Sequence, residues 1–257
     1  MRRGSWVGGG LFLLVAVLWS ALDPLLAFRD VGTLSRPGAD RAGAEAALLS
    51  RGRASLRALR NGLESPDAET RLRCARLLAL AGESEGETLL LAALARAPDE
   101  ERGALVEYLL LSLWDDRKGP RPERAATVLG EPPPERVLLE RRERELDLLL
   151  TMHPAWAGGY AARARLHLLL DEPRLAAKDA AATLFLEPNH FETMVLLGRI
   201  YRRLGNSEQA LAFVERAVRL CPRLERQIAP ELEKLRAAVQ TERERRLKER
   251  RYERPLL

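Results

Sequence analysis

Three prolines set a fixed spacing in the second half of this chain of 257 residues. Pro154, Pro188 and Pro222 stand 34 residues apart, and each follows an apolar, Ala-rich stretch with helical periodicity. A fixed period of this length is typical of stacked helical hairpins, none of which can bury its apolar face alone. The spacing therefore predicts an α-solenoid of antiparallel helical hairpins over residues 157–224.

The composition agrees with an all-α protein. Apolar residues make up 46% of the chain and aromatic residues only 5%, and Ala, Leu, Arg and Glu dominate. This mixture favours helices that pack through small and branched aliphatic side chains. Alternating β-branched runs bounded by turn residues, which predict strands, are almost absent.

The second segment of the period, Phe191 to Leu224, resembles a tetratricopeptide repeat (TPR). Its signature offsets hold Leu197, Gly198, Tyr201, Gly205, Ala210, Ala217 and Pro222. The preceding segment fits the pattern at Tyr160, Ala164, Ala176 and Pro188. It departs from the family at Arg163, where Leu is preferred, and at His167, where Tyr is preferred. The resemblance implies a surface that binds other proteins.

In TPR proteins the first helix of each hairpin lines a concave groove. Transferred by offset, the predicted groove residues are Ala161, Arg165, Leu168, Val195, Arg199 and Arg202. Three arginines converging on one groove would bind carboxylates or phosphates, so the predicted partner is an acidic or phosphorylated protein segment. The alternative is a solvated helix face. The Lys and Asn clamp of chaperone-binding members is not reproduced, because Ala161, Arg165 and Leu196 stand at the corresponding places.

The N-terminus favours a membrane anchor. Arg2 and Arg3 precede an uncharged run from Gly4 to Leu22, whose apolar part is close to the shortest that spans a bilayer. Cleavage after Ala21 or Ala27 would place a large residue three positions before the cut, which signal peptidases disfavour. We predict an uncleaved single-pass anchor with the bulk of the chain outside the cytoplasm, on the periplasmic side if the source is bacterial. Secretion after cleavage is the alternative.

A first helical array is predicted over residues 43–117. Within it, Gly62 to Leu80 resembles a HEAT-type repeat, a short helix followed by a Pro-Asp turn and a second helix, and Ser65 is placed to cap that second helix. A second copy is predicted over residues 89–114. The Pro-rich stretch 118–134 then either bends a continuous solenoid or separates two bodies.

The ends of the predicted repeats carry further signals. Asn189 and Asn206 are placed to cap the helices that follow them. After Pro222, the apolar pattern over residues 224–239 predicts a helix that covers the end of the stack and that begins or bends at Pro230. The charged extension beyond it is predicted to be solvated, with contact to anionic lipid or to a partner helix as alternatives.

The predicted organisation has six segments. These are a signal anchor or signal peptide (1–28), a linker (29–42), HEAT-like repeats (43–117), a Pro-rich junction (118–134), TPR-like repeats with a capping helix (135–240) and a charged extension (241–257).

The sequence carries no recognisable motif for catalysis or for binding a cofactor or metal. No Gly-rich phosphate loop or catalytic constellation is recognisable, so we expect neither an enzyme, nor a small-molecule substrate, nor a cofactor. Cys74 and Cys221 form no CxxC spacing, and the three histidines do not cluster with them, so we expect no metal site. The net charge of +5 lies largely in a C-terminal tail that is interleaved with Glu, which argues against nucleic-acid binding. The predicted function is a membrane-tethered scaffold for other proteins; the alternative is an envelope assembly or export chaperone.

Overall fold

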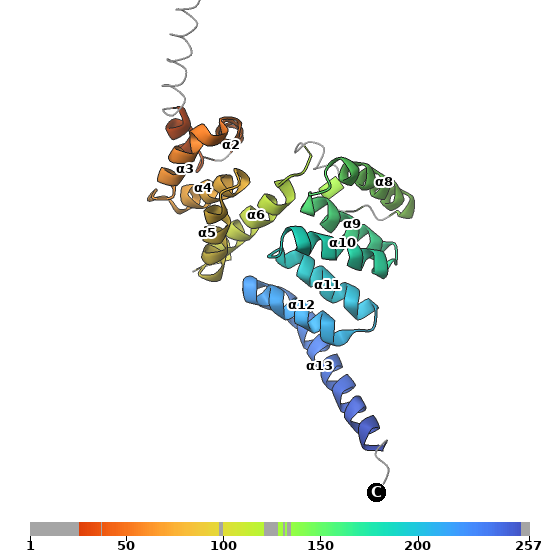
Figure 1. The fold of residues 1–257 in the computed structure, drawn as a ribbon. Coiled ribbons are helices and arrows are strands. Elements are labelled where there is room, and N and C mark those ends of the chain that lie inside the picture. The colour runs from red at the N-terminus through yellow and green to blue at the C-terminus, as the bar shows by residue number, and fades with distance from the viewer. Residues whose placement is uncertain are drawn as a thin grey trace, which may run out of the picture. The chain divides into compact units, whose positions relative to one another are not determined.

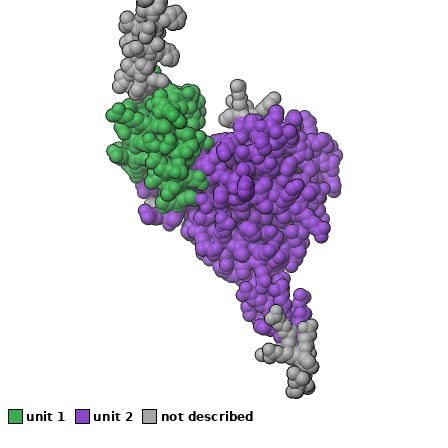
Figure 2. Space-filling model, viewed as in Figure 1, with its two compact units in different colours: residues 1–93 green, residues 94–257 purple. Residues whose placement is uncertain are grey.

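The computed structural model describes residues 26–36, 38–97, 100–120, 128–130, 132 and 135–252, and these residues form helices and turns with no strand among them. The all-α prediction is therefore confirmed for this part of the chain. The chain divides into two compact units, residues 1–93 and 94–257 (Figure 2). The Pro-rich stretch 118–134, predicted as a junction, falls inside the second unit.

The uncharged run of residues 4–22, whose apolar part from Trp6 to Leu22 is the predicted membrane span, lies outside the described residues. Across the described ranges, no helix is both long enough and apolar enough to cross a bilayer.

The first unit is a small helical body (Figure 1). Its elements are α2 (Ala39–Ser50), the 3-10 helix η1 (Gly52–Ser55), α3 (Leu56–Gly62), α4 (Ala68–Leu80) and most of α5 (Ser84–Ala95). Of the two helices predicted for residues 62–80, the second is present as α4, whereas the first lies earlier than predicted, as α3, and ends at Gly62. The two pack together at Gly62, where an added Cβ would lie 2.4 Å from the Cys74 sulfur. Val31 and Leu34, from the predicted linker, belong to the core of this unit. The HEAT-like assignment stays a prediction.

The cap of α4 differs from the prediction. Asp67, and not Ser65, stands directly before the first helical residue, and its carboxylate accepts hydrogen bonds from the Thr70 backbone N–H at 2.8 Å and from the Thr70 hydroxyl at 2.6 Å. These bonds hold the pKa of Asp67 below its usual value. Ser65 lies two residues too early, and its hydroxyl accepts a bond from the Asp67 N–H instead.

The second unit contains the predicted hairpins. Its elements are α6 (Glu100–Asp116), α8 (Arg136–Met152), α9 (Ala157–Leu169), α10 (Pro173–Leu186), α11 (Phe191–Arg203), α12 (Ser207–Leu220) and α13 (Arg223–Tyr252). Helices α9 and α10 form one hairpin and α11 and α12 the next, with α10 packed on α11, α8 packed on α9, and α12 packed on α13 (Figure 1). The repeated helical hairpins of the prediction are therefore confirmed.

The two hairpin turns have the same backbone design. In the first, the Glu172 N–H donates to the His167 carbonyl at 2.8 Å, and Asp171 adopts a left-handed φ of 66°. In the second, the Asn206 N–H donates to the Tyr201 carbonyl at 2.9 Å across Gly205, whose φ is 76°. This six-to-one bond around a left-handed residue closes the end of each first helix and fixes where its second helix begins.

One of the two predicted caps is confirmed. The Asn206 side chain accepts a bond from the Gln209 N–H at 3.1 Å. At α11 the cap is His190 and not Asn189, because His190 directly precedes the first helical residue, and its Nδ1 accepts a bond from the Thr193 N–H at 3.4 Å.

Helix α6 runs across the turns that join successive hairpins. The Trp156 indole donates to the Asp115 carbonyl at 2.6 Å, and the Trp114 ring lies 5.0 Å from the ring of His190. Trp156 and His190 are 34 residues apart, so α6 contacts equivalent points of consecutive repeats. Helix α6 therefore packs against the repeats, within the same unit.

Helix α13 ends the stack. Leu232, Leu235 and Val239 are buried, as expected for a capping helix. The helix begins at Arg223, so Pro230 lies inside it and does not mark its start. A proline removes one backbone donor, and here the helix continues through it, with Ile228 before it and Leu232 after it packed in the same apolar cluster.

Candidate functional site

The first helices of the two hairpins, α9 and α11, line a cavity of about 290 Å³ together with the start of α13. We call this cavity and the helix faces around it the groove. Its lining residues are Ala161, Arg165, His190, Glu192, Thr193, Val195, Leu196, Arg199, Leu224, Gln227 and Ile228.

The structure brings together most of the predicted groove residues. Ala161, Arg165, Val195 and Arg199 line the cavity. Leu168 instead packs against the core between the two hairpins, at the back of α9. Arg202 lies one turn beyond the cavity on α11, where it faces helix α13.

The three predicted arginines all have carboxylate neighbours in the chain itself. Arg199 and Arg202 share Glu231 of α13, with nitrogen–oxygen distances of 3.3 and 3.9 Å. Arg165 lies 3.7 Å from Glu192. Their side chains are 41% to 53% exposed, so the ion pairs are in contact with solvent. Sequence reasoning missed Glu231, because α13 follows no repeat offset that would have placed its side chains.

Two titratable groups lie deeper, near Arg165. Burial raises the pKa of Asp115 to about 6, although the positive charge of Arg165 lowers it in part. Burial, together with the same guanidinium, lowers the pKa of His190 to about 3. His190 Nε2 has no hydrogen-bond partner within the described part of the chain, and the lowered pKa favours the neutral imidazole at pH 7. The sequence analysis missed both groups, because it considered only residues on the first helix of each hairpin and neither group lies there.

A second group of polar side chains lies between α8 and the first hairpin, and we call it the first-repeat ion network. Its members are Glu143, Asp147, Arg163, His167, Glu172 and Asp179. The Arg163 guanidinium donates two bonds to Asp179, both of 2.7 Å, and a third of 2.7 Å to Asp147. Asp179 is nearly inaccessible to solvent, so this bidentate pair is largely desolvated.

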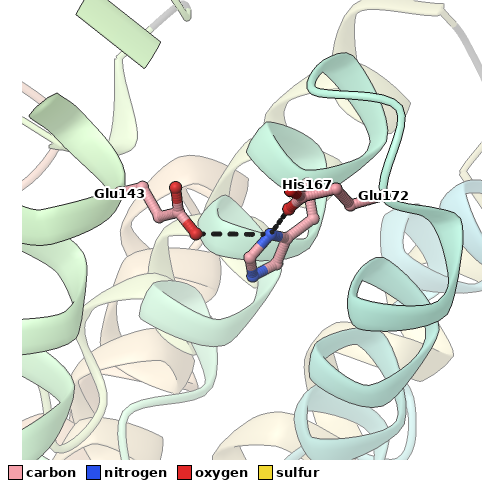
Figure 3. Close-up of side chains that lie close together, drawn as sticks. All are labelled: Glu143, His167 and Glu172. Atoms are coloured by element: carbon pink, nitrogen blue, oxygen red, sulfur yellow. Dashed lines mark hydrogen bonds and ion pairs between the residues drawn. The ribbon is translucent and has the colours of Figure 1, made fainter. Parts of the chain in front are cut away.

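His167 is the centre of the network (Figure 3). Its Nε2 lies 3.4 Å from Asp179, and its Nδ1 lies 3.0 Å from Glu172 and 3.5 Å from Glu143. The bond with Asp179, followed by that with Glu172, raises the pKa of His167. The sequence marked Arg163 and His167 as departures from the TPR pattern. Their shared partner was missed, although Asp179 follows Arg163 by 16 residues, the separation that pairs the two helices of a hairpin.

Comparison with known proteins finds two solved structures with weak similarity to this chain. No protein-family model matches the chain, and no curated protein matches it. Two solved structures that match are described as crystal structures of MamA. One is 13% identical, with a TM-score of 0.33, and covers 73% of this chain and 96% of that one. The other is 12% identical, with a TM-score of 0.32, and covers 82% and 96%. Similarity at this level supports no conclusion about function.

Proposed function

We propose that this chain is a protein-interaction scaffold whose concave groove holds a segment of another protein. The observation that supports this most is the cavity that two consecutive hairpins build together. Arg165 and Arg199 stand at equivalent positions of the two repeats, both line that cavity, and both are about half exposed. A pocket that combines apolar side chains with two guanidinium groups fits an anchor residue of a partner together with nearby polar groups.

The segment proposed for the groove is acidic. Glu231 already places a carboxylate between Arg199 and Arg202. Exposed ion pairs of this kind contribute only about 0–1 kcal/mol, so a carboxylate of the partner can replace Glu231 at little cost. Replacement would also release α13 from one of its contacts with α11.

The test is partner capture from solubilised membranes by chemical crosslinking and mass spectrometry. The variant Arg165→Ala, Arg199→Ala, Arg202→Ala is expected to lose most of its captured partner while its helicity stays unchanged. A control removes three exposed arginines of α8, with Arg136→Ala, Arg141→Ala, Arg144→Ala, and changes the net charge equally. Equal capture by the two variants would show that the groove arginines do not bind the partner.

We also propose that the scaffold is tethered to a membrane, and the support for this is the uncharged run of residues 4–22. Full-length protein is expected to stay with the membrane pellet after alkaline carbonate extraction, and a chain lacking those residues is expected to be released. Release of both chains would leave the scaffold without its anchor.

A further inference from the structure

We propose that the first-repeat ion network binds a divalent transition-metal ion such as zinc, with Glu143, His167 and Glu172 as the protein ligands. This site lies between α8 and the first hairpin, its residues do not line the groove, and it does not depend on the function proposed for the groove.

The spacing of the three ligand atoms fits such an ion. Two ligands that each lie about 2.0–2.1 Å from a tetrahedral zinc ion are about 3.3 Å apart. His167 Nδ1 lies 3.0 Å from a carboxylate oxygen of Glu172 and 3.5 Å from one of Glu143. All three ligand atoms lie within 4.8 Å of one another (Figure 3). An ion can therefore be placed among them with small adjustments of the two glutamates.

The histidine is oriented as metal-binding histidines are. Its Nε2 faces Asp179, which is itself held by two bonds from Arg163. A carboxylate on one ring nitrogen fixes the tautomer that leaves the other nitrogen free to bind a metal, and it increases the basicity of that nitrogen. In this arrangement Asp179 is a positioning residue and Nδ1 is the ligand atom.

The glutamate at position 172 is also held in place by the backbone. The Glu172 N–H donates to the carbonyl of His167 itself, at 2.8 Å, in the turn that closes α9. Two of the three ligands are therefore joined through one short turn, whereas Glu143 comes from the neighbouring helix α8. An ion at this point would fasten α8, α9 and the start of α10 to one another.

The charges of the network favour a cation. Four carboxylates, those of Glu143, Asp147, Glu172 and Asp179, surround one guanidinium and one imidazole. Glu143 and Glu172 are 26% and 42% exposed while His167 is 8% exposed, so the site opens to solvent on the glutamate side. An ion can enter there, and water can supply a fourth ligand.

The test is calorimetric titration of the chelator-treated full chain with Zn²⁺ at pH 7, with Co²⁺ absorption as a second measurement. We expect one Zn²⁺ per chain and a higher Tm in its presence. Glu143→Gln with Glu172→Gln keeps the side-chain shapes and is expected to weaken binding by about tenfold or more and to remove the rise in Tm. His167→Gln should do the same.

Glu145→Gln is the matched control, because Glu145 lies on α8 two residues from Glu143 but pairs with Arg141. It is expected to bind Zn²⁺ as the wild type does. The proposal is overturned if the wild type binds no Zn²⁺, or if the double glutamine variant binds it with the affinity of the control. Circular dichroism of every variant separates loss of binding from loss of folding.

Discussion

The two hairpins share one backbone design but differ in chemistry where their two helices meet. The equivalent pairs, each 34 residues apart, are Arg163 and Leu197, His167 and Tyr201, and Asp179 and Phe213. In the second hairpin, Tyr201 and Phe213 stack with ring centroids 5.6 Å apart. In the first, His167 and Asp179 meet at the same place as an ion pair. The frame therefore accepts either an ionic or an aromatic contact there, while its turn geometry stays the same.

The contact between the two helices of each hairpin shows that side-chain sizes compensate for one another. The second hairpin pairs Gly198 with Val214, and an added Cβ on that glycine would lie 2.3 Å from a Val214 methyl group. The first hairpin has Ala164 and Ala180 at the equivalent positions, both fully buried in one cluster. A larger residue on one helix is thus matched by a smaller one on the other, which keeps the spacing between the helices.

At neutral pH the largest expected effect comes from breaking the ionic pair of the first hairpin. Arg163→Leu installs the residue of the second hairpin but leaves Asp179 buried without its bidentate partner. We expect the free energy of unfolding to fall by about 3 kcal/mol, measured by urea denaturation. The triple change Arg163→Leu, His167→Tyr, Asp179→Phe copies the whole apolar set and should be at least as stable as the wild type. A triple variant less stable than Arg163→Leu alone would show that the two centres are not interchangeable.

The small residue of the second hairpin gives the next effect. Gly198→Ala is expected to lower the free energy of unfolding by about 1–3 kcal/mol, because the new methyl group collides with Val214. Adding Val214→Ala copies the first hairpin and should recover part of the loss. A double-mutant cycle measures this coupling, and strictly additive effects would argue against the compensation.

The turns crossed by α6 differ in their response to pH. Trp156 does not titrate, but at the equivalent turn the pKa of His190 is lowered to about 3 from an ordinary value of 6.5. Between these values the unfolded chain binds the proton and the folded chain does not, so this group adds stability as pH rises, by up to about 1.4 kcal/mol per pH unit.

Asp115 acts in the opposite direction, because its pKa is raised to about 6 from 3.8, and the stability from its folded-state protonation is lost as pH rises through that window. The measurement is therefore a difference in unfolding free energy between the wild type and His190→Asn, which keeps a capping acceptor. That difference should change with pH from about 3 to 6.5 and be constant above 7. A constant difference throughout would mean that His190 is not buried in its neutral form.

The smallest expected effect is at the hairpin turns. Asp171 has a left-handed backbone where the second hairpin has Gly205. Asp171→Gly should therefore stabilise the first hairpin by about 0.5 kcal/mol through its backbone. The substitution also removes the exposed ion pair between Asp171 and Arg203, which reduces this gain. Thermal unfolding measures the change, with Gly205→Asp, which should destabilise, as the reverse substitution.

The sequence predicted what the backbone period controls and missed what depends on contacts between distant segments. The spacing of the prolines predicted both hairpins, and the same offset placed Arg165 and Arg199 at one cavity. It could not place Glu231, because a helix that ends the stack follows no repeat. Its cap assignments were wrong by one residue at His190 and by two at Asp67, since a cap is set by the first helical residue and not by the most favourable residue type nearby.

The most direct test of the groove as the binding surface is site-specific photocrosslinking in cells. A photoreactive amino acid at Leu196 would lie in the cavity wall, and one at Leu148 would lie on the exposed face of α8. The account predicts that position 196 crosslinks to a discrete partner protein and that position 148 does not. Crosslinks from position 148 alone, or the same products from both positions, would contradict it.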